Sequence, residues 1–356
     1  MLRSTRTFLY CLALALFGSP ALGHAYSACV GTSAELDDAM AQAAVTTDAS
    51  ISIRIREGTY VSGSGIIFYV NLTHSNQSVN VSGGWSGAAC ENRRYGAESG
   101  TVLVGSSLSS ALLFNAGFGT TGNTFDATDL TLRNDEGTSN DAIGACLTIQ
   151  LNAGSTARAY RMLLDGCVGN SSATLSNSSG DLTFANSVVR GGYTAGAPVY
   201  LYTNNGTNQL AHLTITGNTA TSSAQEASGL HVLADPSPIS TVTLGNSVVW
   251  GGVAPAGIPD IATNGPGITF IRAHYETRSH LNAPVVDNMP SHGDPRFLTS
   301  THALPRPDSL LVDSGTAINI GGGMDVDGNT RTQGAAVDVG AYERDPDLIH
   351  ADGFDR

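Results

Sequence analysis

The chain has 356 residues, 42 of them glycine, and a formal net charge of −13 at pH 7. All 17 basic residues are arginine, which excludes lysine Schiff-base chemistry and a phosphate-binding GxxxxGK[ST] loop, and the acidic balance argues against an electrostatic nucleic-acid binder. Hydrophobic residues make up 41% of the sequence, so there is enough apolar material for a buried core.

Residues 1–23 have the pattern of a secretory signal peptide. Arg3 and Arg6 precede an unbroken run of ten apolar residues over 8–17, and Ala21-Leu22-Gly23 supplies the small residues of a cleavage site. A ten-residue helix spans about 15 Å, half of a bilayer's hydrocarbon core, so a membrane anchor is the weaker interpretation. We therefore expect a protein that is secreted or resides in the cell envelope, with no membrane span after signal removal.

Four cysteines follow the signal: Cys29, Cys90, Cys146 and Cys167. Four cysteines in an exported chain indicate two disulfides. The chain has no CxxC motif, which disfavours a zinc site. Three connectivities are open. We favour Cys29–Cys90 with Cys146–Cys167, because pairing sequence neighbours closes the smaller loops.

The first element expected after the signal is a short helix over 33–44. Thr32 and Glu35 form a capping box, and Leu36, Met40 and Ala43 lie on one helical face together with Ala44. Such a helix is suited to covering the open end of a stack of strands, although it could also pack elsewhere. The alternating segment over 51–60 then predicts a first strand.

An internal repeat organises the rest of the chain. TFANSVVRGG (183–192) and TLGNSVVWGG (243–252) match at seven of ten positions, and HLTITGN lies between them. Related segments recur every 28 residues on average and can be aligned on one aliphatic residue each, namely Val81, Leu103, Leu132, Leu164, Val189, Ile215 and Val249. A period in this range indicates a solenoid or a propeller.

A glycine or asparagine stands two residues after each aligned position: Gly83, Gly105, Asn134, Gly166, Gly191, Gly217 and Gly251. These residue types enter the left-handed backbone region at least cost, so one left-handed bend is expected in every coil. Short strands with one recurring bend predict a parallel β-helix. A propeller needs blades of about 40 residues, and a β-sandwich would show hairpin turns instead of a fixed period.

The order of a capping helix, ISIRIREGTY, a GGW segment before Cys90 and glycine-bounded coils resembles secreted bacterial proteins of the pectate-lyase-like superfamily. The segments over 304–317 and 325–343 resemble the terminal module of "choice-of-anchor Q" proteins. The resemblance implies an all-β, single-stranded right-handed parallel β-helix over 24–344 with a short N-terminal capping helix. A C-terminal module would occupy 304–344 and a tail 345–356.

The residue after each aligned position should point outward, and stacking would bring these residues into one column. The column contains Arg133, Asp165, Arg190 and Trp250, and its other members are Ser82, Val104 and Thr216. Because adjacent strands lie about 4.8 Å apart, Asp165 would stand between two guanidinium groups. Arginine binds carboxylates and tryptophan offers a flat face to a sugar ring, so the column is a candidate site for an acidic glycan. The alternative is a self-neutralising ladder of ion pairs on a solvated face.

Catalytic residues are not assigned. In lyases of this superfamily an arginine or lysine base lies near carboxylates that hold calcium; Arg133 or Arg190 would fit by position, but the column has one acid. The Asn-Thr-Asp and Gly-His-Gly motifs of the related hydrolases are absent, and the Asp37-Asp38 pair falls in the expected capping helix.

Two further clusters contain residue types that can bind metal ions. Asp325, Asp327 and Asn329 alternate like the start of a calcium loop, but the rest of the EF-hand pattern fails, so a turn held by its own side chains is favoured over calcium. Three histidines, His274, His280 and His292, lack a metal-ligand spacing and are expected as solvated loop residues. No cofactor is therefore expected, and calcium is the one alternative.

Taken together, these patterns favour an exported β-helix protein that binds polysaccharide or another cell-surface ligand without turnover. A polysaccharide lyase or hydrolase of the same fold and a structural or adhesin-type envelope protein are the alternatives.

Overall fold

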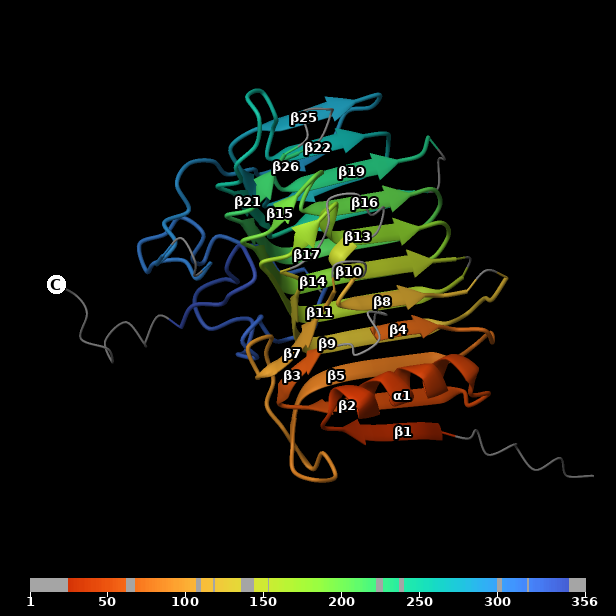
Figure 1. Cartoon of the computed structure of the whole chain (residues 1–356). Helices are drawn as coiled ribbons and strands as arrows, with labels where there is room; N and C mark the ends of the chain where they lie inside the picture. The colour runs from red at the N-terminus through yellow and green to blue at the C-terminus, as the bar shows by residue number, and fades with distance from the viewer. Residues whose placement is uncertain are drawn as a thin grey trace, which may run out of the picture.

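The chain winds into a stack of parallel strands (Figure 1). The computed structural model describes residues 25–61, 68–106, 110–117, 119–135, 144–152, 154–221, 227–236, 240–299, 303–318 and 320–345. The expected signal peptide and nearly all of the expected tail lie outside these residues. Successive coils add strands to a 15-stranded sheet, called here the long sheet, and to an eight-stranded sheet. The predicted all-β parallel β-helix is confirmed.

The central path of the long sheet runs through β1 (Ala25–Val30), β2 (Ser50–Arg56), β5 (Ser78–Ser86), β9 (Thr124–Arg133), β11 (Thr156–Asp165), β14 (Asp181–Arg190), β17 (Thr207–Thr216), β20 (Thr241–Gly245), β23 (Ile268–Ile271) and β26 (Val286–Asn288). Beside this path pair β3 (Gly58–Val61), β6 (Asn92–Arg93), β7 (Thr101–Val104), β21 (Val248–Trp250) and β24 (His274–Tyr275).

The eight-stranded sheet contains β4 (Phe68–Asn71), β8 (Leu112–Asn115), β10 (Gly144–Leu151), β13 (Ser171–Asn177), β16 (Val199–Thr203), β19 (Leu230–Ala234), β22 (Ile261–Asn264) and β25 (Arg278–Leu281). A third sheet consists of β12 (Val168–Gly169), β15 (Tyr193–Thr194) and β18 (Thr219–Ala220). Among the described strands, the β5–β6 pair is the antiparallel one.

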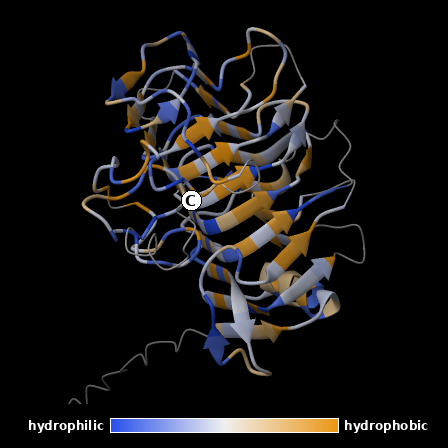
Figure 2. Cartoon of the chain, turned by 90° about the vertical axis from the view of Figure 1, so that its left-hand side faces the viewer, coloured by the Kyte–Doolittle hydropathy of each residue, from blue (hydrophilic) through white to orange (hydrophobic). Residues whose placement is uncertain are grey.

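The predicted aliphatic ladder forms the core between the sheets. Its members pair in register from one coil to the next and are at most 1% exposed: Leu103, Leu132, Leu164, Val189, Ile215 and Val249. Figure 2 shows the hydrophobic residues recurring from strand to strand along the stack. Apolar side chains inside the stack are thus buried between the coils above and below. The hydrophobic effect of this burial is the main stabilising contribution in such a solenoid.

The first predicted ladder position is wrong. Val81 pairs with Ala127 instead of joining the ladder, and Ser82 pairs with Thr128 instead of continuing the column at Arg133. The reason is an additional excursion of the chain after β5, through the β5–β6 pair, so that β7 and not β5 lies beside the end of β9.

The predicted helix and both favoured disulfides are present. Helix α1 (Ser33–Val45) begins with the Thr32–Glu35 capping box, and its buried residues Leu36 and Met40 join the main core at the N-terminal end of the stack. The two disulfide bonds join Cys29 to Cys90 and Cys146 to Cys167.

The coils contain two left-handed bends, where one was expected. The predicted glycine bend is present at Gly166, Gly191, Gly217 and Gly251, with φ between 61° and 69°. It is absent at Gly83, where Gly84 adopts it instead, and at Gly105 and Asn134. Asn134 instead donates hydrogen bonds through its side chain to the carbonyls of Ser106 and Ala145.

The second bend lies in the middle of the long sheet and uses residues other than glycine. Register places six such residues one above another, all with φ between 44° and 61°: Asp129, Arg161, Asn186, His212, Asn246 and Arg272. We call this set the bend column. A left-handed conformation costs a non-glycine residue about 1–2 kcal/mol, so these side chains must gain compensating contacts.

Candidate functional site

The predicted arginine and aspartate column forms on the outer face of the long sheet. Arg133 Nη2 donates to Asp165 Oδ2 at 2.9 Å, and Arg190 Nε donates to Asp165 Oδ1 at 3.1 Å. Burial raises the pKa of Asp165, but the hydrogen bonds and positive charges of Arg190 and Arg133 outweigh it and hold that pKa below its ordinary value. Asp165 therefore stands between two guanidinium groups, as the spacing predicted.

The positive charge of this column is largely neutralised by Asp165 within it and by Glu98 beside it. Arg190 also lies 3.9 Å from Glu98 and its side chain is 17% exposed, whereas the side chain of Arg133 is 48% exposed. Two guanidinium groups thus face two carboxylates. The arrangement leaves little positive charge for an acidic glycan and corresponds to the alternative, a self-neutralising ladder of ion pairs.

Trp250 follows this column one strand beyond Thr216. The indole is half-buried against the cluster of Val248, Leu311 and Val339, and its ring lies 5.5 Å from that of His274. The structure therefore places Trp250 at the contact between the β-helix and the described residues 303–318 and 320–345, which are called the C-terminal module from here on.

The carboxylate of the calcium candidate Asp325 accepts hydrogen bonds from the chain itself. Its Oδ1 accepts from the backbone of Asp327 and Asn329 at 3.0 and 2.7 Å, and its Oδ2 accepts from the backbone of Glu343 at 3.0 Å. The segment is thus a self-bonded turn. Within the described residues, no group of three or more histidines, cysteines or acids could hold a metal ion.

His274 was expected in a solvated loop, and this expectation is wrong. The side chain is buried in β24, with Nδ1 2.9 Å from Ser291 Oγ and Nε2 2.9 Å from the Gly293 carbonyl. Both ring nitrogens therefore hold the last coil together.

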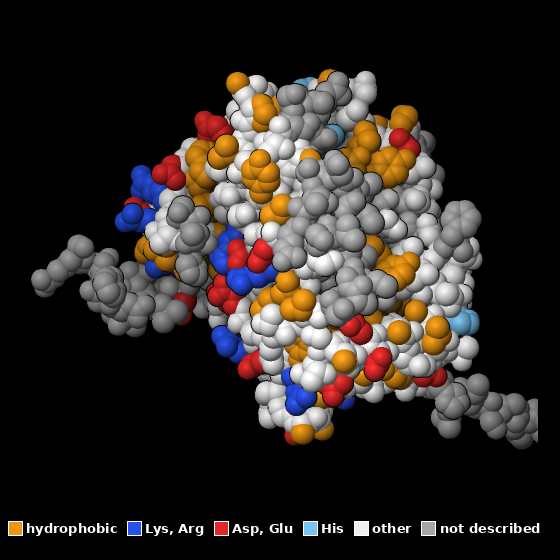
Figure 3. All heavy atoms as spheres, in the orientation of Figure 1, with side chains coloured by type: hydrophobic (Ala, Val, Ile, Leu, Met, Phe, Trp, Pro, Cys, Tyr) orange, Lys and Arg blue, Asp and Glu red, His pale blue; other side chains and the backbone are white. Residues whose placement is uncertain are grey.

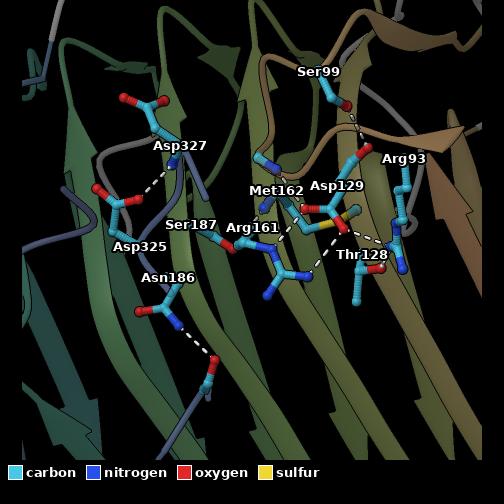
Figure 4. Close-up of polar contacts among 12 residues, drawn as sticks. Arg93, Ser99, Thr128, Asp129, Arg161, Met162, Asn186, Ser187, Asp325 and Asp327 are labelled. Atoms are coloured by element: carbon cyan, nitrogen blue, oxygen red, sulfur yellow. Dashed lines mark hydrogen bonds and ion pairs between the residues drawn. The ribbon is translucent and has the colours of Figure 1, made fainter. Parts of the chain in front are cut away.

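The N-terminal end of the bend column binds the excursion that follows β5 (Figure 4). Asp129 is fully buried and accepts two hydrogen bonds from Arg161, at 2.6 and 3.0 Å, and one from Arg93 at 2.6 Å. Its Oδ1 also accepts from the Gly96 backbone at 2.7 Å. Sequence analysis missed this cluster, because the left-handed position carries a different residue type in almost every coil.

The C-terminal end of the bend column binds the C-terminal module. Asn186 donates to the Gly321 carbonyl and Asn246 donates to the Thr316 carbonyl, both at 2.7 Å. Arg331 is buried and donates from Nε to His212 Nδ1 at 3.1 Å and from Nη1 to the Ala341 carbonyl at 3.1 Å. The polar side chains whose contacts offset the cost of the left-handed backbone thus attach the module to the solenoid.

The outer face of the eight-stranded sheet carries two columns of uncharged side chains. Register aligns one column as Asn71, Asn115, Gln150, Ser176, Tyr202, Leu233, Asn264 and Leu281. It aligns the other as Tyr69, Leu113, Thr148, Thr174, Tyr200, His231, Ala262 and Ser279. In Figure 3 the charged side chains gather mainly on the side of the C-terminal module and toward the N-terminal end of the stack.

The tyrosines of this face contact neighbouring side chains, and a pocket opens beside them. Tyr202 donates through its hydroxyl to Asp235 at 2.8 Å, and the rings of Tyr200 and His231 meet edge to face at 5.4 Å. A pocket of about 470 Å³ opens beside His231 and Leu233 near the C-terminal end of the sheet. The sequence signal for these columns is the alternation of side chains in strands such as VYLY (199–202) and GLHVL (229–233), and the repeat alignment used above did not include these strands.

None of the described helices is long and apolar enough to cross a membrane. No family model, curated protein or solved structure matches the chain.

Proposed function

We propose that this chain is an exported β-helix protein that binds an uncharged polysaccharide along the outer face of the eight-stranded sheet. The observation that carries the proposal is the absence of charged residues among the sixteen side chains of its two columns, of which thirteen are exposed or half-buried and three, Leu113, Thr148 and Ala262, are buried. The chain as a whole has a formal charge of −13, so these two columns of described residues differ in charge from the chain's average.

The chemistry of the face suits sugars. Amide side chains such as Gln150 and Asn264 both donate and accept hydrogen bonds, as sugar hydroxyl groups require. The half-buried rings of Tyr69, Tyr200 and Tyr202 add flat apolar surface with a polar tip. Because the side chains repeat at the spacing of the strands, about 4.8 Å, they suit an extended repeating ligand.

Binding without turnover is favoured over hydrolysis or elimination. Glycoside hydrolysis requires two carboxyl groups flanking the bond that breaks. The two described columns contain none, and the nearby carboxylate of Asp235 accepts the hydroxyl of Tyr202. Export is supported by the two disulfides, since such bonds persist in oxidising compartments.

Affinity electrophoresis tests the proposal with gels that contain a neutral β-glucan, xylan, mannan or polygalacturonate. The chain should be retarded by at least one neutral polymer. Gln150→Ala and Tyr202→Ala should each weaken retardation about tenfold, because each removes contacts worth roughly 1.4 kcal/mol. Gln42→Ala, an exposed site on α1, is the matched control and should leave binding unchanged.

Retardation by polygalacturonate alone, or equal retardation of Gln150→Ala and the parent chain, would contradict the proposal. Release of reducing ends or unsaturated products from a neutral polymer would replace binding with catalysis.

A further inference from the structure

A separate cavity of about 400 Å³ opens on the outer face of the long sheet, where the C-terminal module crosses it. Its floor is formed by outward side chains of β11, β14 and β17, and Ile320 and Gly321 of the module line one side. The polar lining consists of Thr156, Arg158, Tyr160, Asp181, Thr183, Thr207 and Gln209. None of these residues belongs to the columns of the eight-stranded sheet.

The module forms a fixed side of this cavity. In register with Tyr160, the next coils carry Ala185, Ala211 and Gly245, and over these small residues the module can approach the sheet closely. A Cβ atom at Gly245 would lie 2.5 Å from Ile318 Cδ1. Because Asn186 and Asn246 bind the backbone of residues 321 and 316, this crossing segment is held on both sides of Ile318. The cavity is therefore present before any ligand arrives.

The middle of the floor carries a row of polar side chains, and Asp126 extends this row beside the cavity. Register aligns Asp126, Arg158, Thr183 and Gln209 in adjacent strands. The Arg158–Asp126 pair is long, 3.5 Å from Nη1 to Oδ1, and the two side chains are 45% and 26% exposed. The other nitrogens of the guanidinium fork are thus not committed to this carboxylate.

We propose that this cavity binds one or two residues of a neutral saccharide. Guanidinium, amide and carboxylate groups can each engage two neighbouring sugar hydroxyls, and Tyr160 lines the cavity beside them. Asp181 lines the cavity and Asp126 pairs with Arg158, so the local charge disfavours a uronic acid. The volume is within the ordinary range of small-molecule sites. This inference does not depend on the function proposed for the eight-stranded sheet.

Titration calorimetry on the whole chain tests the inference, using the trisaccharides of β-1,4-linked glucose, xylose and mannose, with trigalacturonate as the charged counterpart. At least one neutral trisaccharide should bind. Gln209→Ala and Arg158→Ala should each raise its Kd at least tenfold, and Thr207→Trp, at the exposed rim, should abolish binding by filling the cavity. Gln42→Ala, the same substitution at the exposed site on α1, should leave the Kd unchanged, and Gln150→Ala is measured beside it to show whether the trisaccharide occupies the eight-stranded sheet instead.

Each outcome bears on one site. Loss of trisaccharide binding in Gln150→Ala but not in Gln209→Ala would overturn this inference and leave the proposed function standing. Tighter binding of trigalacturonate than of every neutral sugar, or no binding of any trisaccharide at millimolar concentration, would also overturn it. Loss of polymer retardation with trisaccharide binding intact would remove the proposed function alone.

Discussion

Acid should weaken the attachment of the C-terminal module through His212. Arg331 donates its Nε hydrogen to His212 Nδ1, and an arginine is always protonated, so this nitrogen must be an acceptor and the imidazole neutral. Burial, and then the charge of Arg331, lower the pKa of His212 well below its ordinary 6.5, against a hydrogen bond to the Asp338 backbone. At His212, the folded state therefore binds fewer protons than the unfolded state below pH 6.5. Stability from this residue is present above pH 6.5 and is lost as the pH falls.

The magnitude follows from proton linkage. Protonation of a histidine with a pKa of 6.5 stabilises the unfolded state by about 2 kcal/mol more at pH 5 than at pH 7. His212→Asn removes this proton site and suits the backbone, because asparagine tolerates the left-handed region and already occupies it at Asn186 and Asn246. The stability advantage of the parent chain over the variant should thus shrink by about 2 kcal/mol from pH 7 to pH 5.

Urea unfolding followed by tryptophan fluorescence measures this difference, with both chains compared at each pH. The comparison matters because burial raises the pKa of Glu343 to about 7, which favours the folded state as the pH falls and opposes the effect of His212. Glu343 is common to both chains and cancels. A difference between the chains that stays constant from pH 7 to pH 5 would refute the Arg331–His212 hydrogen bond.

Two further predictions concern stability. Asp129→Asn keeps the left-handed backbone but leaves Arg93 and Arg161 without their buried carboxylate, so it should cost about 3–5 kcal/mol in urea unfolding; a loss below 1 kcal/mol would contradict the role assigned to this cluster. Replacing both Cys29 and Cys90 by serine should cost about 4 kcal/mol, and replacing the other disulfide about 3 kcal/mol, because their sequence separations are 61 and 21 residues. The reverse order of the two losses would show that loop entropy does not decide their contributions.

The repeated part of the molecule was predictable because each coil repeats the same physical problem. An aliphatic residue must fill the interior and a glycine must turn the corner, so Leu164, Val189 and Gly191 could be placed from spacing alone. The same spacing put Asp165 between Arg133 and Arg190. The error at Val81 has the same origin, since a local excursion breaks the period without altering the residue pattern.

The remaining features depend on contacts that no period encodes. The bend column uses aspartate, arginine, asparagine and histidine at one backbone position, so composition gives no common signal. Asn186 and its partner Gly321 are 135 residues apart, and the docking of the module follows from such pairs. Trp250 met the pattern of an exposed sugar platform, but the module packs against it.

Oxidative footprinting of tyrosines tests the central functional claim most directly. The chain would be exposed to hydroxyl radicals with and without the neutral polymer that retards it, and each tyrosine followed by mass spectrometry. Oxidation of Tyr69, Tyr200 and Tyr202 should fall on binding, whereas Tyr95 and Tyr193, which are 44% and 55% exposed on other surfaces, should react as before. Protection of Tyr95 or Tyr193 with unchanged oxidation of the three tyrosines on the eight-stranded sheet would contradict the claim.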